Sequence, residues 1–225
     1  MTLLRAALVL TVLTVTACAD PTVVFDRSSP QPIQRMAVLT PGFPTEPDVS
    51  VPAPTSGALF LLVNGIQQGN RSREFAGMVV NAGANPEAEF SAALLACLRD
   101  AKFQPVATQT DARRTALLKE YAAYAGTGTD AVLDVVVSRY GYRAPTQASP
   151  FQPSLTILAR LVALPSRTVL MQDRIDMANV APEGAKSVDH SFQDYSDIAA
   201  APAKAVQGLQ SAMRAAAATV CKRLT

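Results

Sequence analysis

The sequence predicts an α+β fold with a mainly antiparallel sheet and helices packed on one face of it. Hydrophobic residues alternate with polar ones over three long segments, 131–142, 155–164 and 169–177, which is the period of a strand. They recur at helical spacing over 86–102 and again near the C-terminus. The expected helices are grouped apart from most of the expected strands, as in α+β proteins.

The composition fits one globular domain. Of the 225 residues, 49% are hydrophobic and 17% are charged. The 20 lysines and arginines nearly balance the 18 aspartates and glutamates, so the formal net charge is only +2. Such a balance does not predict the basic surface that nucleic acids require, and we expect no nucleic-acid partner.

The N-terminus predicts export. Arg5 supplies a positive charge, and the ten residues 6–15 contain neither a charge nor a proline. This run is about half the length of roughly 20 residues that a membrane-spanning helix needs. We therefore expect residues 1–17 to be a signal peptide that is removed.

The sequence Val15-Thr16-Ala17-Cys18 resembles the lipobox of bacterial lipoproteins, in which an aliphatic residue and two small residues precede an obligatory cysteine. The resemblance implies that the Cys18 thiol receives a diacylglyceryl group, that a dedicated peptidase cuts before it, and that a further acyl chain such as palmitate is added to the new amino group. Two or three acyl chains hold a protein on a membrane without a spanning helix. The alternative is a secreted protein that is cut after Ala17 and keeps Cys18 as a structural residue.

The rest of the chain divides into a tether and a domain. We expect residues 18–32 to be the lipidated cysteine and a proline-containing tether, and residues 33–225 to be a single periplasmic α+β domain. In the lipoproteins that the lipobox resembles, an aspartate directly after the cysteine tends to retain the protein in the inner membrane. That position is Ala19 here, so the outer membrane is the favoured location.

In the first half of the domain we expect a strand over 33–39, ended by Thr40-Pro41-Gly42, and then a proline-punctuated surface loop. An apolar run closed by Asn64-Gly65 predicts one limb of a hairpin over Ala58–Ile66, and Gln67–Glu74 is expected to be exposed. Asn85-Pro86-Glu87 predicts the start of a helix through Lys102, because asparagine caps, proline suits the first turn and glutamate complements the positive helix end. A second helix is expected from Asp111 to Tyr124 or Ala125.

The second half is expected to be a strand from Ala131 to about Tyr142, and then a long antiparallel hairpin that turns at Pro165-Ser166-Arg167. A loop over 181–193 precedes the C-terminal helix, in which Pro202 either introduces a kink or restarts the helix. This order, from Ile33 to Leu224, is similar to the TolB amino-terminal and curli-secretion-lipoprotein type of domain, and to auxiliary lipoproteins of ABC-type transporters. The similarity is architectural and brings no functional motif beyond the lipobox.

The chemistry-bearing residues do not predict an enzyme. His190 is the single histidine, in a polar segment expected to be exposed. A catalytic role would pair it with Cys97, Ser187 or Ser191, but Cys97 lies on an apolar helical stripe that should face inward. No cysteine and histidine spacing fits a zinc site, and no glycine-rich loop fits a phosphate cradle. We expect no catalytic residue, no metal and no cofactor.

Two features remain as candidates. Tyrosine and arginine are enriched at binding hot spots, so Arg139, Tyr140, Tyr142 and Arg143 form a possible partner patch, unless the tyrosines only complete the hydrophobic face of the sheet. After lipidation of Cys18 two cysteines remain, and in an oxidising compartment a pair is more often bridged than free. Cys97 and Cys221 lie on the inner sides of their helices and either form a disulfide or remain as two buried thiols.

These features lead to three hypotheses. The first is a non-enzymatic accessory or assembly lipoprotein that contacts another envelope protein from the periplasmic face of the membrane. The second is a lipid- or small-ligand-binding component that serves an ABC-type transporter, which a deep apolar pocket would favour. The third is a hydrolase, which a cleft with convergent polar residues and a buried base would favour.

Overall fold

The computed structural model describes residues 22–26, 33–51, 58–164, 166–178 and 190–225. In the first helix the side chains are described from Gly65 onward. The expected signal peptide, the lipobox with Cys18, and most of the loop over 181–193 lie outside the described residues.

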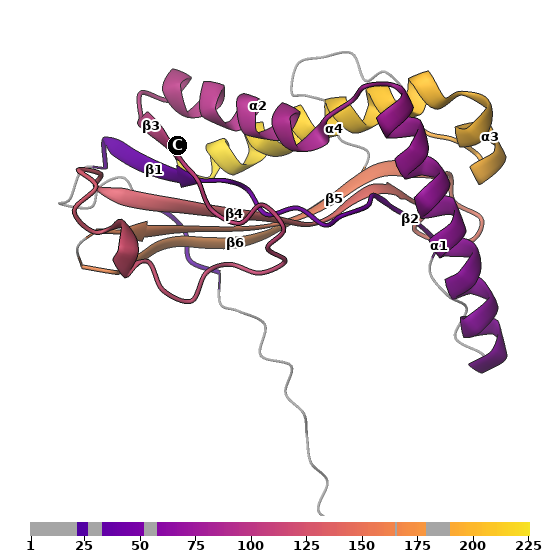
Figure 1. Ribbon diagram of the computed structural model, residues 1–225, viewed down its shortest axis with the longest axis horizontal. Coiled ribbons are helices and arrows are strands. Elements are labelled where there is room, and N and C mark those ends of the chain that lie inside the picture. The colour runs from indigo at the N-terminus through magenta and orange to yellow at the C-terminus, as the bar shows by residue number, and fades with distance from the viewer. Residues whose placement is uncertain (1–21, 27–32, 52–57, 165, 179–189) are drawn as a thin grey trace, which may run out of the picture.

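A six-stranded mixed sheet forms the centre of the fold (Figure 1). Its order is β3-β1-β4-β5-β6, and β2 pairs with the end of β4. β4, β5 and β6 are antiparallel, whereas β1 and β2 pair with β4, and β3 with β1, in parallel. The α+β class is confirmed, and the parallel pairs make the sheet mixed rather than purely antiparallel. The strands are β1 Arg35–Leu39, β2 Asp48–Ser50, β3 Gln104–Thr108, β4 Ala131–Arg143, β5 Gln152–Ala163 and β6 Val169–Ala178.

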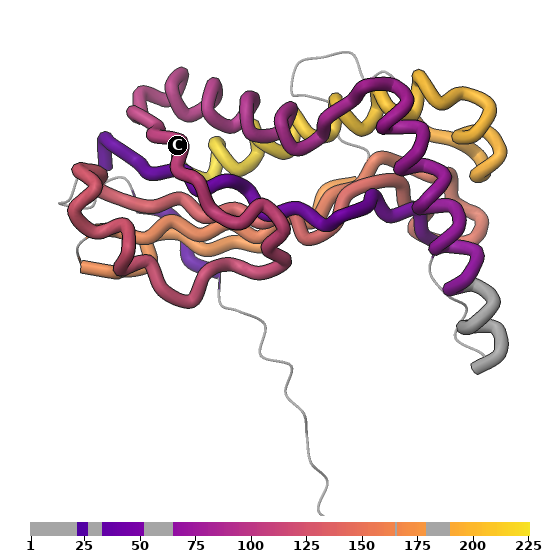
Figure 2. Tube along the Cα trace, in the orientation of Figure 1, coloured from indigo at the N-terminus to yellow at the C-terminus, as the bar shows by residue number. Residues whose placement is uncertain are grey.

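Two long helices lie side by side over one face of this sheet, α2 Pro86–Asp100 and α4 Pro202–Lys222 (Figures 1 and 2). The expected cap of α2 is confirmed, since the Asn85 side chain accepts a hydrogen bond from the Ala88 N–H over 3.0 Å. The short helix α3 Tyr195–Ala200 precedes α4, and Pro202 restarts the helix rather than kinking it. Helix α1 Ala58–Asn81 stands at the end of the sheet where β2 lies.

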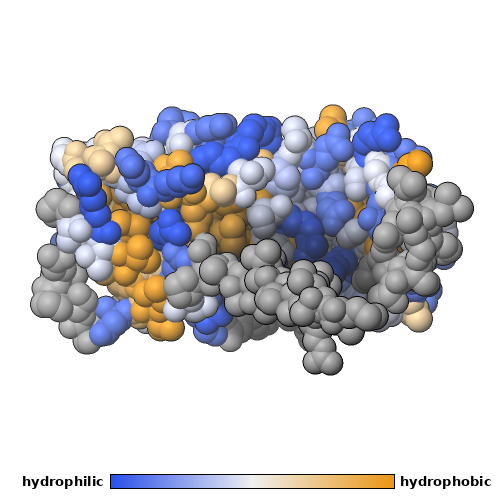
Figure 3. All heavy atoms as spheres, turned by 90° about the horizontal axis from the view of Figure 1, so that it is seen from below, coloured by the Kyte–Doolittle hydropathy of each residue, from blue (hydrophilic) through white to orange (hydrophobic). Residues whose placement is uncertain are grey.

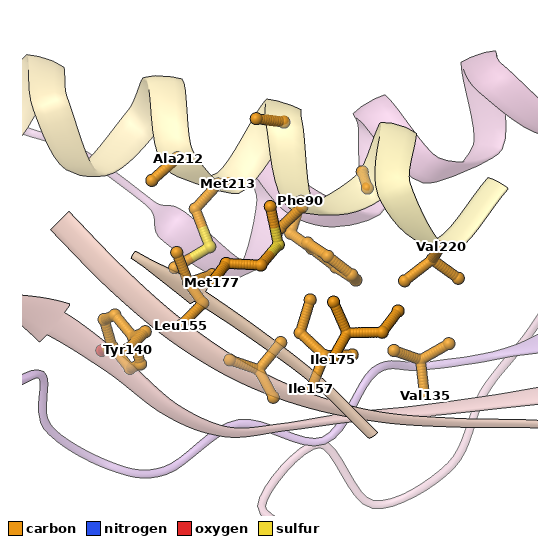
Figure 4. Close-up of a cluster of buried hydrophobic side chains, with 14 of the residues drawn as sticks. Phe90, Val135, Tyr140, Leu155, Ile157, Ile175, Met177, Ala212, Met213 and Val220 are labelled. Atoms are coloured by element: carbon orange, nitrogen blue, oxygen red, sulfur yellow. The ribbon is translucent and has the colours of Figure 1, made fainter. Parts of the chain in front are cut away.

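The core lies between the sheet and the helices α2 and α4 (Figure 4). Alternate residues of the three long strands, among them Val135, Ile157 and Ile175, point to the helices and meet Met213 and Val220 of α4. Each fully buried side chain of this size contributes about 1.5–3 kcal/mol. The period-two pattern in the sequence therefore identified the residues that hold the helices on the sheet.

The expected hairpin limb over Ala58–Ile66 is wrong, because this stretch begins helix α1. The helix is stabilised by contacts outside itself, which outweigh the turn signal of Asn64-Gly65. The Ser72 hydroxyl accepts a hydrogen bond from the Val49 N–H of β2 over 3.0 Å, and the Gln68 amide donates to the Val51 carbonyl over 2.6 Å.

The expected helix from Asp111 to Tyr124 or Ala125 is also wrong. The segment 109–130 is irregular apart from one 3-10 turn, Ala122–Tyr124, and strand β3 before it was not expected. Asp134 of β4 holds this segment, since its carboxylate accepts hydrogen bonds from the Leu118 N–H over 2.8 Å and from the Tyr121 hydroxyl over 2.9 Å. These contacts fix a conformation that a continuous helix could not adopt.

Candidate functional site

Among the described residues, segment 109–130 covers one half of the sheet face opposite α2 and α4. There the segment 109–130 packs Leu118 and Tyr121 on Val132 and Val162. Asp134 lies beneath it, wholly buried, and Arg114 pairs with it over 2.7 Å. This buried ion pair is enclosed and has its hydrogen-bond partners, so it fastens the cover and offers nothing to a ligand.

The other half of this face holds a hollow of about 410 Å³, which we call the arginine hollow. Figure 3 shows this face, and hydrophilic residues line a recess in the right half of the view. The side chains reach it because Thr156 and Asp176 alternate with the core residues of β5 and β6 and so point away from the helices. The hollow is lined by Arg139, Arg143, Pro145, Ser154, Leu155, Thr156, Arg174, Asp176, Met177 and Ala178.

A chain of polar contacts crosses the floor of the arginine hollow. Arg139 Nη2 donates to the Thr156 hydroxyl over 3.2 Å, and that hydroxyl donates to Asp176 Oδ1 over 2.7 Å. Arg174 Nε donates to Asp176 Oδ2 over 3.0 Å. The hydrogen bond from Arg174, helped by Thr156, holds the pKa of the Asp176 carboxyl below its usual value. Asp176, the one carboxylate among the described lining residues, is thus ionised and already paired.

Arg139 and Arg143 both have guanidinium donors without a partner among the described residues. Arg139 Nε is buried and has no hydrogen-bond partner among the described residues. The Arg143 side chain makes no hydrogen bond or ion pair with any atom that the structure describes. A buried donor left without an acceptor costs about 1–3 kcal/mol, and this cost is removed when an acceptor enters. Counted over its described lining residues, the arginine hollow therefore has an excess of two positive charges and donors for an anion.

The four residues of the expected partner patch do not share one surface. Tyr140 and Tyr142 are 6% and 0% exposed and face the helices, whereas Arg139 and Arg143 line the arginine hollow. The irregularity between Val137 and Arg139 shifts the alternation of β4 and turns the tyrosines into the core. Of the two alternatives, the structure agrees with the second, in which the tyrosines complete the hydrophobic face of the sheet, and only the arginines remain available to a ligand or partner.

Cys97 of α2 and Cys221 of α4 are joined by a disulfide, with their Cα atoms 6.2 Å apart. The bridge lies between the two helices that cover the sheet. A sulfur atom in a disulfide is not a free thiol and cannot act as a nucleophile, and so Cys97 cannot serve in the catalytic pair considered for His190.

His190 is buried, with 7% of its surface exposed, and the expectation that it would be solvated is wrong. It lies against α4 at Gly208, where a Cβ atom added to the glycine would be 2.8 Å from the Cβ of His190. The polar residues around His190 in the sequence predicted exposure, and they could not show that α4, which is formed by a later part of the chain, packs against this histidine. The position of His190 against Gly208 suits a packing role.

Val23 lies within the expected tether and pairs with the outer strand β6. Its N–H donates to the Gln172 carbonyl over 2.8 Å, and the Gln172 N–H donates back over 2.9 Å. The first described contact with the fold therefore occurs five residues after Cys18.

Other possible sites are less developed. Among the described residues, no three histidine, cysteine or acidic side chains are grouped so that they could hold a metal ion. An apolar hollow of about 150 Å³ lies between α2 and the β1 and β3 strands. Within the described part of the chain, no helix is both long enough and apolar enough to cross a bilayer.

Several solved structures resemble this chain at low sequence identity. Protein XCC0632 of Xanthomonas campestris, from family DUF330, is 13% identical, with 89% of this chain and 91% of that chain covered and a TM-score of 0.43. The PelC dodecamer of Paraburkholderia phytofirmans is 12% identical, with 85% and 86% covered and a TM-score of 0.41. Lipoprotein GNA1162 of Neisseria meningitidis is 15% identical, with 67% and 88% covered and a TM-score of 0.34. The sequence matches no protein-family model and no curated protein. Function is therefore argued from the residues of this chain.

Proposed function

We propose that this chain is a lipid-anchored cell-envelope lipoprotein whose domain acts by contact with an envelope partner and not by catalysis. The lipobox supports the anchor, because Cys18 follows an aliphatic residue and two small ones at the end of an export signal. The outer membrane is the proposed location, because Ala19 and not an aspartate follows the cysteine.

The pairing of Val23 with Gln172 carries this proposal furthest. An extended chain spans at most about 3.5 Å per residue, so Cys18 reaches no more than about 18 Å from Val23. A lipidated Cys18 would hold β6 near the membrane surface. It would also hold there the sheet face opposite α2 and α4, which we call the helix-free face. The domain would then work at the membrane, and would not reach far into the periplasm on a long tether.

The non-catalytic part of the proposal is supported by the burial of the single histidine and by the state of Cys97, one of its three candidate nucleophiles. Cys97 is in the disulfide, and His190 is packed against α4. The alternative, a lipid- or small-ligand-binding component of an ABC-type transporter, has less support. A transported lipid or apolar ligand needs an apolar pocket for its body, and the apolar hollow of about 150 Å³ is smaller than the roughly 300–1,000 Å³ of typical ligand pockets.

Fatty-acid labelling in a Gram-negative host tests the anchor. The parent chain is expected to incorporate radiolabelled palmitate and to sediment with outer membranes. The Cys18→Ser variant should lose the label and accumulate as the longer precursor. Ala17→Gly, which keeps a small residue before the cysteine, is the matched control and should remain labelled. A labelled Cys18→Ser chain, or an unlabelled parent chain, would contradict the proposal.

Sorting and catalysis are tested separately. Ala19→Asp is expected to shift the labelled protein to the inner membrane, whereas Ala19→Ser should leave it in the outer membrane. Ser191→Ala and His190→Asn should both restore the envelope phenotype of a deletion strain when the variants are stably folded. If either folded variant fails to restore it while Cys18 is labelled, the non-catalytic role is wrong.

A further inference from the structure

The arginine hollow lies beside the point where the N-terminal segment joins the sheet. Val23 pairs with Gln172, and Arg174 is two residues further along the same strand, with its side chain on the same face as that of Gln172. Successive same-face residues of a strand are about 7 Å apart. Arg174, which lines the hollow, therefore lies about 7 Å along β6 from the residue with which Val23 pairs.

The chemistry of the hollow favours a phosphate group. A guanidinium presents several N–H donors in a planar fork that matches phosphate oxygens. Asp176 is occupied by Arg174 and Thr156, and so it does not compete for the free donors of Arg139 and Arg143. A phosphate in the hollow would find the Arg143 guanidinium without another described partner, and the enclosed Arg139 Nε would gain the acceptor that it lacks once the Arg139 side chain turns toward the phosphate.

The geometry points to the phosphate of an anionic phospholipid headgroup as the ligand of the arginine hollow. This assignment rests on the proposed anchor at Cys18, which would bring headgroups within about 18 Å of Val23. The headgroup contact would orient the domain with its helix-free face toward the membrane, and would leave α2 and α4 facing away from it.

Vesicle binding tests the inference with a chain that begins at Ala19. Every strand and helix and the disulfide of the described structure lie after Thr22, so this chain keeps the whole fold. It also lacks Cys18, and its binding is therefore independent of lipidation. We expect it to co-sediment with vesicles of phosphatidylcholine and phosphatidylglycerol, but not with phosphatidylcholine alone, and we expect inorganic phosphate to compete.

Charge-matched variants identify the surface. Arg139→Gln/Arg143→Gln should weaken binding to the anionic vesicles at least tenfold, whereas Arg73→Gln/Arg99→Gln removes the same charge from α1 and α2 and should change it less than twofold. If the first double variant does not fold, Arg143→Gln alone, which removes no described side-chain hydrogen bond or ion pair, is expected to weaken binding measurably.

Three results would overturn the assignment. If both double variants lost the same amount of vesicle binding, the binding would depend on the net charge of the protein and not on the arginine hollow. If the chain bound neither anionic vesicles nor inorganic phosphate, the hollow would not be an anion site. Binding of inorganic phosphate with no binding to vesicles would keep the anion site and overturn the headgroup as its source. A failure of Cys18 labelling would contradict the anchor and would not change these binding results.

Discussion

The hydroxyl of Tyr142 donates a hydrogen bond to the main-chain carbonyl of Ala205 over 3.0 Å and thereby joins the end of β4 to α4. Tyr142 is fully buried, and its ring packs edge to face against Phe75 and Phe192. Gly208, less than one turn along α4, leaves the space that this hydroxyl occupies. The strand and the helix can approach this closely because position 208 has no side chain.

We therefore expect Gly208→Ala to lower the free energy of unfolding by about 1–3 kcal/mol, as overpacking does. The added Cβ would overlap the Tyr142 hydroxyl and would lie 2.8 Å from His190 Cβ. The effect opposes the roughly 1 kcal/mol by which alanine is favoured over glycine in helices. Urea denaturation measures it, with Gly77→Ala in α1 as the control, since a Cβ there meets nothing within 4 Å. Equal stability of the two variants would contradict the packing argument.

Alkaline pH is expected to destabilise the fold through its buried tyrosines. Burial, and then the charge of Glu87, raises the pKa of Tyr140 to about 12. An unfolded tyrosine ionises near pH 10, so the unfolded chain releases its proton first and the contribution to stability is lost as the pH rises from 10 toward 12. The unfolding free energy should fall over this interval. It should fall less steeply in Tyr140→Phe, and parallel curves for the two chains would show that Tyr140 does not contribute.

Local signals predicted most of the antiparallel half of the fold. The alternation in β4, β5 and β6 and the Asn85 cap of α2 act within a few residues, and the structure agrees with each. The expectations failed where groups far away in the sequence determine the local conformation. Asp134 imposes an irregular path on 109–130, although Leu117, Tyr121 and Tyr124 recur at helical spacing.

The site was predicted in part, for the same reason. Arg139 and Arg143 were named from one short motif, whereas Thr156, Arg174 and Asp176 join them through strand pairing. The expected hairpin contains the needed signal, because its register places Thr156 opposite Asp176. The irregularity after Val137, which separates the arginines from the tyrosines, has no signature in the sequence pattern.

The buried ion pair beneath segment 109–130 provides a further prediction. Arg114 is 8% exposed and Asp134 is 0% exposed, so Arg114→Met would leave a buried carboxylate without its cation. We expect a loss of about 3–5 kcal/mol in unfolding free energy, and a smaller loss in Arg114→Met/Asp134→Leu, which removes both charges. Denaturant titration of the single and double variants measures the difference.

The control for that pair is Arg174→Met. It breaks the Arg174 and Asp176 pair, whose side chains are 64% and 56% exposed, and exposed pairs contribute about 0–1 kcal/mol. If Arg114→Met is no more destabilising than Arg174→Met, the buried pair does not fasten the irregular segment to the sheet.

The disulfide between α2 and α4 provides the last prediction. It closes a loop with a sequence separation of 124 residues, and cross-linking so long a loop restricts the unfolded chain by about 5 kcal/mol in the chain-entropy estimate. This is comparable with the whole net stability of an ordinary domain. We expect Cys97→Ala/Cys221→Ala to lower the unfolding free energy by about 2–5 kcal/mol, because removal of a native disulfide has that cost.

Two measurements separate the covalent effect from the loss of packing. The chain that begins at Ala19 contains only these two cysteines, so when it is unfolded without a reductant it should show no reactive thiol, and two after reduction. The reduced parent chain keeps both sulfur atoms in the core but lacks the bond, and its stability should fall close to that of the double alanine variant. Two reactive thiols before reduction would show that Cys97 and Cys221 do not form a disulfide. A reduced chain as stable as the oxidised one would show that the bond adds nothing to the packing of α2 on α4.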